Sequence, residues 1–481
     1  MEPEVNPARV IRKVMWTLLP WLWVAAFWTY MDRSNLTFAA FQIRALFNLS
    51  NTTYGLAGTL FFVGYCAAQL PTNVGMRLLP PGNNPNFLGA IVVIWGTIAA
   101  CTAAQNTVAQ FLALRVLLGI AEAGIFGCSW IHMSQFLSAT ELTFAMGVFF
   151  SVTAISQVIG APLAAAFLVM DGIHGLRGWQ WLYIITGILT VAYGVALKFG
   201  LAKLPSTIWS LTVKERAWLV KRQEAEEAAR NIADPDNGTI LGCLANWRIW
   251  WLSCAWLLEE TVRYGIVFWT PLLLDAMLNG GFNGKAPKKI VRTVHQQATY
   301  SAKLACISAI LYVFAALGTI LVSWSSKRFQ DRRFHISIPL LISGIAFMCV
   351  GDAIKHQGAV VGFVVLVIAG ASDWSCFGPA FSWPAELFHG RARAVAVGLF
   401  NTLGTCGGII GPYLVGRVSD DTGSYKNAMI VLGAFQLASA VLFFTFPEPK
   451  RSAPGTPQTS PGDAADPKVT YNPVYKAPAE V

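Results

Sequence analysis

Long apolar segments recur along most of the chain and are separated by short polar stretches. Twelve of them are long enough to form helices of about 20 residues, the length that crosses the hydrocarbon core of a bilayer. Their centres are Val24, Gly64, Trp95, Gly119, Ala154, Thr190, Leu257, Tyr312, Gly344, Val367, Gly404 and Ala438. The pattern predicts an all-α membrane protein with 12 transmembrane helices.

The composition supports a membrane environment. Of the 481 residues, 55% are hydrophobic and only 12% are charged, whereas about one-quarter of the residues in a soluble domain are charged. The 9 cysteines are scattered, mostly inside predicted helices, and show neither a CxxC pair nor a His/Cys ligand spacing. They are interpreted as small buried apolar residues, so neither a disulfide framework nor a metal site is expected.

The net charge of +10 comes mainly from basic residues in alternate loops. With 12 spans these loops share one side, which the positive-inside rule makes cytoplasmic together with both termini. The basic residues on that side are Arg9, Arg12, Lys13, those between Lys214 and Arg230, Lys327, Arg328, Arg332, Arg333, Arg391, Arg393, Lys450 and Arg451. One basic cluster breaks the rule after the seventh helix, where it either attracts anions or is a solvated loop: Lys285, Lys288, Lys289 and Arg292. The charge is assigned to membrane topology, and no nucleic acid partner is expected.

An internal repeat divides the chain into two halves. The segments MGVFFSV…QVIGAPL…MDG and VGLFNTL…GIIGPYL…DTG align at a constant offset of 251 residues. The matched pairs are Gly147 with Gly398, Phe149 with Phe400, Gly160 with Gly411 and Gly172 with Gly423. Two six-helix repeats related by an axis along the membrane normal are the architecture of major-facilitator transporters, whose substrate site lies between the halves.

The repeat also sets the expected domain boundaries. We predict two six-helix bundles at residues 15–203 and 247–449, joined by a cytoplasmic linker at 204–246 that contains a charged, surface-lying helix. A cytoplasmic tail at 1–14 precedes them. A tail at 450–481, rich in Pro, Gly, Ser and Thr, is predicted to be disordered.

Four ionisable residues interrupt the apolar helices of the first half: Asp32, Arg33, Arg115 and Glu122. A charge at the centre of such a helix costs about 2.5–3.5 kcal/mol, so these side chains generally face the bundle interior or a water-filled cavity. Asp32 and Arg33 point about 100° apart, so each needs another partner. Arg115 lies on the same face as Glu122, roughly 10 Å away.

We predict a network in which Arg33 neighbours Glu122 while Asp32 and Arg115 occupy other parts of the same cavity. The alternative is a purely structural set of ion pairs, or groups that extend toward the helix ends. Burial favours the neutral form of a carboxylic acid, whereas a nearby arginine favours the carboxylate. An anion that competes for Arg33 would therefore link its own binding to proton uptake by Glu122 or Asp32.

The segment YMDRSNLTFA resembles the Asp-Arg-x-Asn signature in the first helix of the anion:cation symporter family, a branch of the major facilitator superfamily. Similar segments are GYCAAQLPTNVGMRLLP, RVLLGIAEAGIFG, DGIHGLRGWQWLYIITGI and PAELFHGRARAVAVGLFNTLGTCGGIIGPYLVGRVSDDTGSY, so the resemblance spans all twelve helices. It implies proton or ion coupling by Asp32 and Glu122, and anion binding or coupling by Arg33.

The resemblance also implies polar positions around the cavity. Tyr30, Tyr65, Gln157 and Asn401 match positions that hydrogen-bond substrate, although each also fits a role in helix packing. Arg115 either binds substrate or stabilises the fourth helix.

Three positions depart from the pattern of that family. Phe144 stands where the family often has arginine, Thr186 where it has glutamate, and Ser326 where it has aspartate. The cytoplasmic gate is therefore expected to differ from that of the family more than the central site does.

The seventh helix carries charges of its own in LLEETVRYGIVFWTPLLL. Glu259 and Glu260 precede Arg263 by four and three residues, spacings that suit local ion pairs on one helix face. Alternatively, Glu260 or Arg263 faces the cavity as a second contact for a polar or dicarboxylate substrate.

We expect a secondary active transporter that moves a small organic carboxylate by alternating access with proton symport. The alternatives are a facilitator or a sugar-phosphate type of anion exchanger, and a nutrient sensor built on a transporter fold. The chain has no Ser/His/Asp set, HExxH or Walker motif, so neither an enzyme nor a cofactor is expected. The expected partners are the anion, a proton or other cation, and the lipid bilayer of a plasma or organelle membrane, with the chain acting as a monomer.

Overall fold

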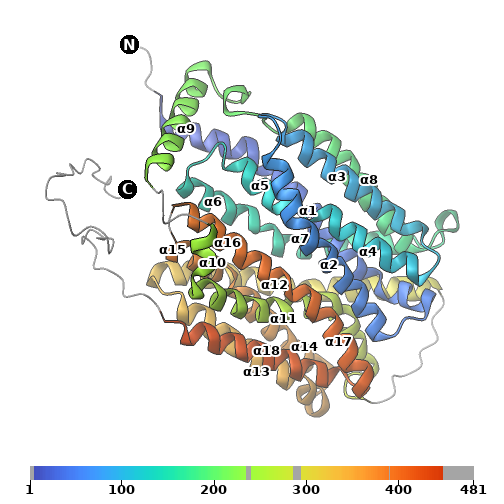
Figure 1. Ribbon diagram of the computed structural model, residues 1–481. Helices are drawn as coiled ribbons and strands as arrows, with labels where there is room; N and C mark the ends of the chain where they lie inside the picture. The colour runs from blue at the N-terminus through green and yellow to red at the C-terminus, as the bar shows by residue number, and fades with distance from the viewer. Residues whose placement is uncertain (1–4, 234–239, 285–293, 389, 448–481) are drawn as a thin grey trace. The chain divides into compact units, whose positions relative to one another are not determined.

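The computed structural model describes residues 5–233, 240–284, 294–388 and 390–447 (Figure 1). All helices lie in one compact unit, Met1–Thr445. A second unit begins at Phe446, and only residues 446–447 of it are among those described. The predicted tail at 450–481 and the cluster of Lys285, Lys288, Lys289 and Arg292 therefore lie outside the described residues.

The first half of the compact unit contains eight α-helices and two short 3-10 helices. The α-helices are α1 (Pro7–Phe47), α2 (Asn51–Arg77), α3 (Asn84–Cys101), α4 (Val108–Glu122), α5 (Ile125–Met133), α6 (Ala139–Phe150), α7 (Val152–Leu168) and α8 (Gly178–Gly200). The 3-10 helices are η1 (Thr102–Ala104) and η2 (Ile173–Gly175). Because α1 begins at Pro7, part of the predicted tail at 1–14 is helical.

A connection and a second set of helices follow. The connection contains η3 (Pro205–Thr207), α9 (Val213–Ala233) and α10 (Ile240–Ala245). The second half contains α11 (Trp247–Asn279), α12 (Val294–Phe329), α13 (Arg333–Gln357), α14 (Ala359–Ser375), α15 (Phe377–Leu387), α16 (Gly390–Thr405), α17 (Gly407–Thr422) and α18 (Tyr425–Thr445). In Figure 1, α1 to α8 fill the upper part of the unit and α11 to α18 the lower part.

These helices form twelve membrane-length segments, six in each half. Ten segments of the described residues are long and apolar enough to cross a membrane, and four of them each combine two α-helices: α4 with α5, α6 with α7, α14 with α15, and α16 with α17. The other two are α2 and α11, which have 27 and 33 residues but carry more polar or charged positions. The predicted all-α fold with 12 transmembrane helices is confirmed.

The two halves repeat one another in local geometry. Gly172 and Gly423 follow α7 and α17, and each has a left-handed backbone, with φ of 88° and 64°, a conformation that glycine adopts without steric cost. Gly160 and Gly411 occupy matching places on these helices. Gly160 lies against Met31 of α1, and Gly411 lies against Thr261 of α11. The offset found in the sequence therefore corresponds to equivalent positions in the fold.

The predicted surface helix of the linker is α9, and it lies against the first half. Lys13 at the start of α1 pairs with Glu215 of α9 at 2.8 Å, and Arg222 of α9 pairs with Glu141 of α6 at 3.0 Å. The hydrogen bond from Lys13, followed by one from the backbone of Thr212, holds the pKa of Glu215 below its usual value. These pairs connect the linker to the end of the bundle where α1 begins.

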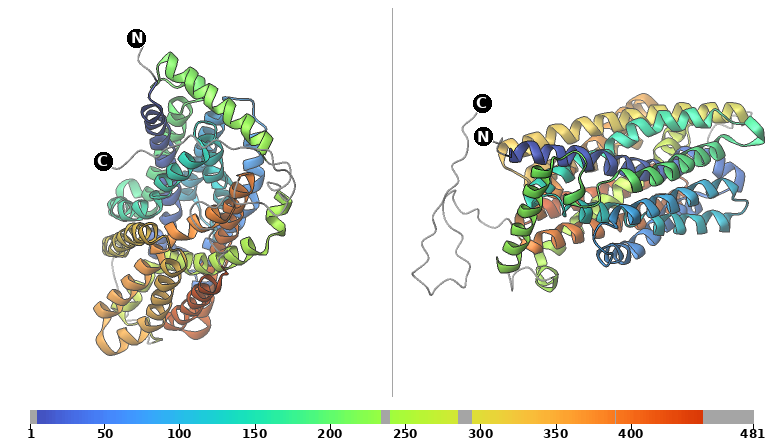
Figure 2. Two further views of the ribbon diagram at one scale, coloured as in Figure 1. Left: turned by 90° about the vertical axis from the view of Figure 1, so that its left-hand side faces the viewer. Right: turned by 90° about the horizontal axis from the view of Figure 1, so that it is seen from above.

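The two halves meet along two pairs of helices, α2 with α17 and α7 with α12, and the second pair runs side by side in Figure 2. At the α2–α17 contact, a methyl group on Gly55 would lie 2.3 Å from the carbonyl oxygen of Pro412. A methyl group on Gly416 would lie 2.3 Å from the carbonyl oxygen of Asn51. Glycine therefore allows the two backbones to touch, and this contact is called the seam below.

The seam also joins a carboxylate of one half to a helix terminus of the other. Asp420 of α17 accepts hydrogen bonds from the backbone N–H of Asn51 at 3.3 Å and of Thr52 at 2.7 Å. It also accepts one from the Thr52 hydroxyl at 2.6 Å. An acidic group is favourable at a helix N-terminus because the first N–H groups have no partner within the helix. Asp420 thus closes the two halves together at the end that holds the α1–α2 connection.

Candidate functional site

The centre of the first half contains a buried ion pair between α1 and α4. Nε of Arg33 donates to Oε2 of Glu122 at 3.1 Å, and the two residues are 5% and 0% exposed. Arg33 lies far from both ends of the 41-residue helix α1, and Glu122 is the last residue of α4. Nη2 of Arg33 and Oε1 of Glu122 have no hydrogen-bond partner among the described residues. The pair is therefore only partly satisfied by the protein itself.

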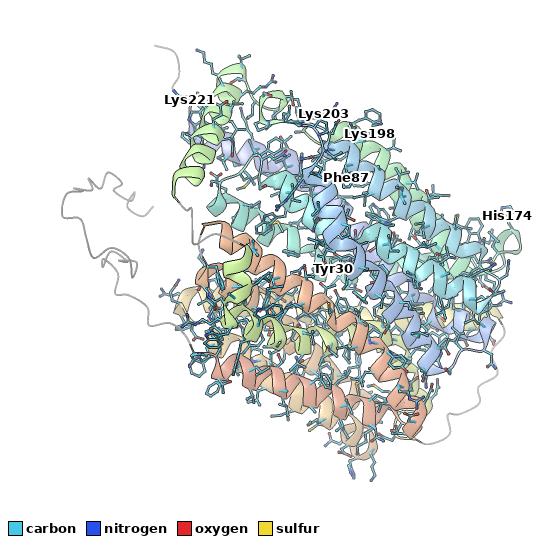
Figure 3. All side chains as sticks on the ribbon, in the orientation of Figure 1. Tyr30, Phe87, His174, Lys198, Lys203 and Lys221 are labelled. Atoms are coloured by element: carbon cyan, nitrogen blue, oxygen red, sulfur yellow. The ribbon has the colours of Figure 1, made fainter. Side chains whose placement is uncertain are left out.

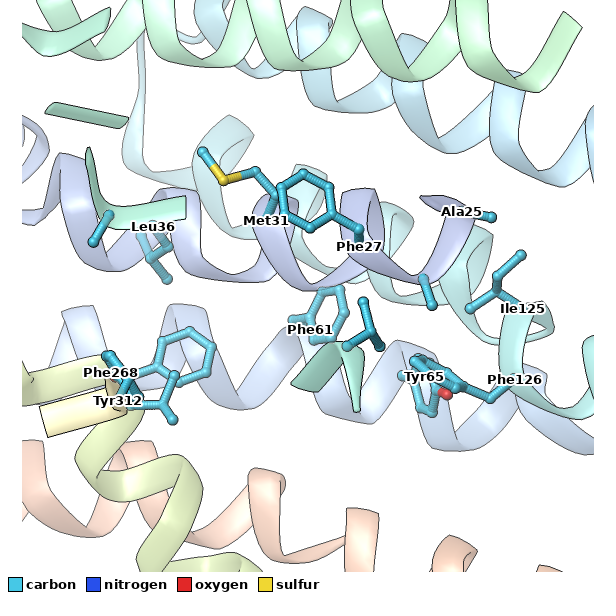
Figure 4. Close-up of a cluster of buried hydrophobic side chains, with 14 of the residues drawn as sticks. Ala25, Phe27, Met31, Leu36, Phe61, Tyr65, Ile125, Phe126, Phe268 and Tyr312 are labelled. Atoms are coloured by element: carbon cyan, nitrogen blue, oxygen red, sulfur yellow. The ribbon is translucent and has the colours of Figure 1, made fainter. Parts of the chain in front are cut away.

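Aromatic rings surround the guanidinium group of Arg33. Its Cζ atom lies 4.7 Å from the ring centre of Tyr65, 5.2 Å from Phe61, 5.4 Å from Tyr30 and 5.6 Å from Phe126. In Figure 4, Tyr65 and Phe126 lie next to one another, with Phe61 further along α2. Figure 3 places Tyr30 between the two ends of the bundle, which are marked by Lys221 and His174. Arg33 is thus a cation at mid-depth inside an aromatic enclosure.

Asp32 points to the opposite side of α1, toward α3 and α8. Its Oδ2 accepts a hydrogen bond from Nε1 of Trp95 at 2.6 Å, and its Oδ1 accepts one from Asn35 at 3.1 Å. Asn35 in turn donates to Thr186 of α8 at 2.9 Å. Asp32 is completely buried. Adjacent residues of one helix therefore bond to different partners, as the 100° rotation between them requires.

Arg115 of α4 bonds to a tyrosine of α8. One of its Nη atoms donates to the hydroxyl of Tyr183 on α8, and its charge acts on Asp32. Arg115 is 1% exposed. Arg33 therefore pairs with Glu122, whereas Arg115 forms no ion pair with a described residue and its charge acts on both Asp32 and Glu122.

Two further predicted contacts, Gln157 and Asn401, differ in their surroundings. Nε2 of Gln157 on α7 donates to the hydroxyl of Ser34 at 2.7 Å, next to Arg33 in the sequence. Asn401 is half-buried on α16 of the second half. Its side chain makes no hydrogen bond to another described residue. The structure joins Gln157 to α1, whereas no bond joins Asn401 to this cluster.

The second half contains a more crowded cluster around Arg263 of α11. Its Nη1 donates to Glu260 at 3.1 Å and its Nε to Asp373 of α14 at 3.4 Å, while Nη2 contacts Glu259. Asp373 also accepts a hydrogen bond from Gln436 of α18 at 2.7 Å. The predicted local pairs of Glu259 and Glu260 with Arg263 are both present. We call these five residues the Arg263 cluster.

The acids of the ion pairs in the two halves occupy matching positions. Glu122 and Asp373 are 251 residues apart, the same offset that relates Gly160 to Gly411. Each acid pairs with an arginine of the first helix of its own half, Glu122 with Arg33 and Asp373 with Arg263. Each also lies near a break in its membrane segment, between α4 and α5 or between α14 and α15. The acid of each pair thus follows the repeat, whereas the two arginines lie on the first helices of the two halves at a different offset of 230 residues, 263 minus 33.

Four residues of these clusters were not identified from the sequence: Trp95, Tyr183, Asp373 and Gln436. Asp373 had a signal, because it is a carboxylate within the apolar segment centred on Val367. The other three have ordinary polar or aromatic side chains for a membrane helix, and only their packing shows the role.

The three departures from the family pattern lie in different environments. Phe144 on α6 is 64% exposed, whereas Ser326 and Thr186 are buried. Ser326 accepts a hydrogen bond from Arg332 at 2.7 Å, and Arg332 also pairs with Glu386 at 2.6 Å. At the loop after α12, arginine and glutamate therefore form a contact although the expected aspartate is absent.

The fold and the buried charged clusters define a membrane transporter of two six-helix repeats. The profile of the Major Facilitator Superfamily matches residues 22–287 and 277–478. The chain therefore belongs to this superfamily, and it is a transporter of small molecules, not an enzyme.

Relatives in bacteria are similar over almost the whole length. The "Putative tartrate transporter" of Agrobacterium vitis is 28% identical over 445 residues, which cover 90% of each chain. The inner membrane transport protein RhmT of Escherichia coli K12 is 29% identical over 439 residues, 91% of this chain and 95% of that one. Both names refer to transport.

Solved structures show the same fold at low sequence identity. A bacterial homolog of the human lysosomal transporter Spinster, in an inward-facing and occupied conformation, has a TM-score of 0.66 and 17% identity, covering 89% of this chain and 95% of that one. A D-xylose-proton symporter also has a TM-score of 0.66, with 13% identity, covering 90% of this chain and 97% of that one. These similarities support the fold alone.

Proposed function

We propose that the chain is a secondary active transporter of a small organic carboxylate that works by alternating access with proton symport. The observation that supports this most directly is the half-paired Arg33. Its Nε binds Glu122 at 3.1 Å while its Nη2 has no partner among the described residues. A buried cation with a free donor is suited to bind an anion, because charge-assisted hydrogen bonds to arginine are strong in a low dielectric.

Glu122 supplies the link to protons in this proposal. Glu122 shares Arg33 with the incoming carboxylate. An anion bound to Arg33 therefore neutralises the positive charge that keeps Glu122 ionised. A completely buried carboxylate without its cation is costly, and proton uptake removes that cost. Asp32 is the second proton carrier of the proposal, since the charge of Arg115 acts on it in the same way.

The surrounding polar residues are proposed to orient the substrate. Tyr30 and Tyr65 flank Arg33, and Gln157 is one hydrogen bond away from the same turn of α1. Asn401 is proposed to approach from the second half, and Arg115 to act through Asp32. An aromatic enclosure with a few fixed polar groups is the usual composition of a small-molecule site.

Alternating access requires the two halves to separate at one end and close at the other. In the proposed topology, with cytoplasmic termini, the seam of α2 with α17 lies on the outer side of the membrane. Asp420 and the N-terminus of α2 hold that side closed. Opening it requires these bonds, the glycine contacts and the hydrogen bonds of Tyr425 with Asn51, Tyr54 with Phe268 and Thr59 with Ile409 to break, which suits a rigid-body movement of two repeats about a central site.

The name of one relative supports a carboxylate substrate, since tartrate is a dicarboxylate. The Arg263 cluster is the proposed second contact of such a substrate through Glu260 or Arg263. All three of the nitrogen atoms of Arg263 already contact carboxylates, however. Arg33 is therefore the proposed primary anion site.

The test is uptake by purified protein in liposomes against a panel of carboxylates, with a pH-sensitive dye inside the vesicles. We expect concentrative uptake driven by an inward proton gradient, together with movement of protons alongside the anion. Uptake of neutral sugars or cations alone would contradict anion binding.

The Glu122→Gln variant separates transport from coupling. We expect it to lose proton-driven accumulation while it retains exchange of labelled for unlabelled substrate. If concentrative uptake persists in this variant, Glu122 is not the coupling residue. If the wild-type protein exchanges substrate without any proton flux, it is an exchanger.

A further inference from the structure

The Arg263 cluster has an excess of acidic groups. Glu259, Glu260 and Asp373 surround one guanidinium group, and they are 0%, 7% and 1% exposed. If all three carboxyl groups were ionised, they would bring two uncompensated negative charges into the interior of a membrane protein. Unpaired buried charges are so costly that such groups become neutral instead. The cluster therefore has to carry protons.

Hydrogen bonding within the cluster leaves acceptor atoms unused. Oε2 of Glu259, Oε2 of Glu260 and Oε1 of Gln436 are buried and have no partner among the described residues. A buried carboxylate with a free oxygen is unfavourable, whereas a protonated carboxyl group places a hydrogen on that oxygen and turns it into a donor. Oε2 of Glu259 and Oε2 of Glu260 are therefore the atoms of the cluster at which a proton can bind.

The three acids differ in how well their negative charge is compensated. Asp373 accepts from both Arg263 and Gln436, and Glu259 contacts Arg263 and the Sγ of Cys376 at 3.9 Å. Glu260 has the single contact with Arg263, and it is the most exposed of the three. Glu260 is thus the carboxyl group that is least stabilised as an anion and most open to exchange.

Glu260 also belongs to the part of α11 that packs against the first half. The positive charge of Arg33 acts on Glu260, and the charge of Glu260 acts on Tyr30 and Tyr264. The ring of Tyr264 lies 4.3 Å from that of Phe62 on α2, which brings this part of α11 against the first half. The ionisable groups around Glu260 are Glu259, Arg263 and Tyr264 of α11, Asp373 of α14, Cys376 after it, and Tyr30 and Arg33 of α1.

We propose that Glu260 is a proton-binding site of the second half, which takes up one proton when an anion binds to Arg33 and releases it when the anion leaves. The inference rests on the proposed function for the anion, and it adds a second-half proton carrier to those of the first half. An anion on Arg33 cancels the positive charge of the other half that acts on Glu260, and the carboxylate of Glu260 is left with Arg263, which it shares with Glu259 and Asp373. It then accepts a proton from a hydronium ion of the solution: one O–H bond of the hydronium ion breaks, water is left, and the O–H bond of the carboxylic acid forms.

A first experiment needs no substrate. Infrared spectra of the purified full-length chain in lipid nanodiscs, recorded over a pH series, report the C=O stretch of protonated carboxyl groups. We expect a band in the wild-type protein that the Glu260→Gln variant lacks and that the Asp421→Asn variant retains, since Asp421 is a half-exposed residue paired with Arg417. An unchanged set of bands in Glu260→Gln would overturn the proposal.

The variant Glu260→Asp covers the case in which the glutamine variant does not fold. It keeps a carboxyl group but moves it by one methylene, so the proposal expects the band to shift in frequency and to stay titratable. A spectrum identical to that of the wild-type protein would count against Glu260.

A second experiment measures stoichiometry in liposomes with tartrate as the probe, from the substrate gradient that balances a set proton gradient and membrane voltage. We expect the Glu260→Gln variant to move one proton fewer per anion than the wild-type protein and the Asp421→Asn control. An unchanged ratio would overturn the coupling role. If the wild-type protein moves neither tartrate nor any other carboxylate, the proposed function fails, while the infrared experiment still decides whether Glu260 holds a proton.

Discussion

The two halves of the protein contain the same arginine–carboxylate pair in different surroundings. In the first half, Arg33 has one carboxylate partner and four aromatic rings around it. In the second half, Arg263 contacts three carboxylates and lies within 5.3 Å of the ring centres of Trp256, Trp374 and Phe377. The repeat thus relates the positions of Glu122 and Asp373, while the neighbouring residues set the net charge of each cluster.

This difference assigns anion binding and proton storage to different halves of the protein. A guanidinium group with a free nitrogen attracts an anion, whereas one that is saturated by carboxylates does not. The second cluster is instead the more acidic of the two and the better store of protons. Substitution by glutamine is therefore expected to reduce anion uptake at Arg33 and stability at Arg263.

The largest effect is expected for Arg33→Gln. Removing one member of a buried hydrogen-bonded charge pair costs about 2–5 kcal/mol, which corresponds to a loss of roughly 30-fold or more in apparent affinity for the anion. Uptake of the best carboxylate should fall accordingly in liposomes. Arg33→Lys keeps the charge but loses the fork geometry, and it should retain part of the activity. Equal uptake by Arg33→Gln and the wild-type protein would contradict the proposal that Arg33 is the primary anion site.

A loss of stability is expected for Arg263→Gln. The substitution leaves three buried carboxyl groups without a cation, and breaking a buried pair costs about 3–5 kcal/mol. Acidic pH should restore part of the lost stability, because protonation removes the uncompensated charge. Thermal unfolding of detergent-solubilised protein at several pH values measures both effects. A variant as stable as the wild-type protein at neutral pH would show that the cluster is already neutral without Arg263.

A smaller effect is expected at the seam for Asp420→Ala. The variant loses the acceptor for the first N–H groups of α2, a change worth about 1 kcal/mol at a helix N-terminus. The outer end should open more often, so that a thiol reagent applied from that side labels a cysteine placed at Thr52 faster. An Asp421→Ala variant has no contact with α2 among the described bonds and serves as the control. Equal labelling rates would show that the glycine contacts and the bonds of Tyr425 with Asn51 and Thr59 with Ile409 close the seam without Asp420.

The smallest effect is expected for the linker, in the variant Glu215→Gln. The pair with Lys13 is near the surface and contributes less than about 1 kcal/mol. Because Lys13 holds the pKa of Glu215 below its usual value, the contribution is present above the unfolded-state pKa and is lost as the pH falls through the folded-state value. Proteolysis of the linker at neutral and acidic pH measures it. The difference between variant and wild-type protein should disappear in acid.

Most of the fold could be predicted from the sequence because the bilayer imposes a simple pattern. Apolar segments of membrane length give the helix count, and glycines such as Gly160 and Gly411 reveal the repeat where helices must approach closely. The division of single membrane segments into two helices, as at α4 and α5, could not be predicted. Such breaks depend on local packing, since the apolar pattern continues through them.

The candidate site was predictable to the extent that buried charge is rare in a membrane helix. This criterion identified Asp32, Arg33, Arg115 and Glu122, and the predicted proximity of Arg33 and Glu122 is present as a 3.1 Å contact. The same criterion could have identified Asp373. It could not have shown that Trp95 donates a hydrogen bond to Asp32, because tryptophan is common in membrane helices and the sequence does not show which group its indole N–H meets. Pairing between distant helices is set by packing, which the sequence pattern does not specify.

The seam is built from glycine backbones and from hydrogen bonds to a helix terminus, whereas the proposed substrate site is built from other side chains. Gly55 and Gly416 allow α2 and α17 to touch without any group that a substrate would meet. Mutations that change Gln157, Asn401 or the rings around Arg33 therefore leave the closing surface as it is. During evolution, the substrate specificity of this fold can therefore change through a few substitutions at the substrate site, while the surfaces at which the two halves close stay the same.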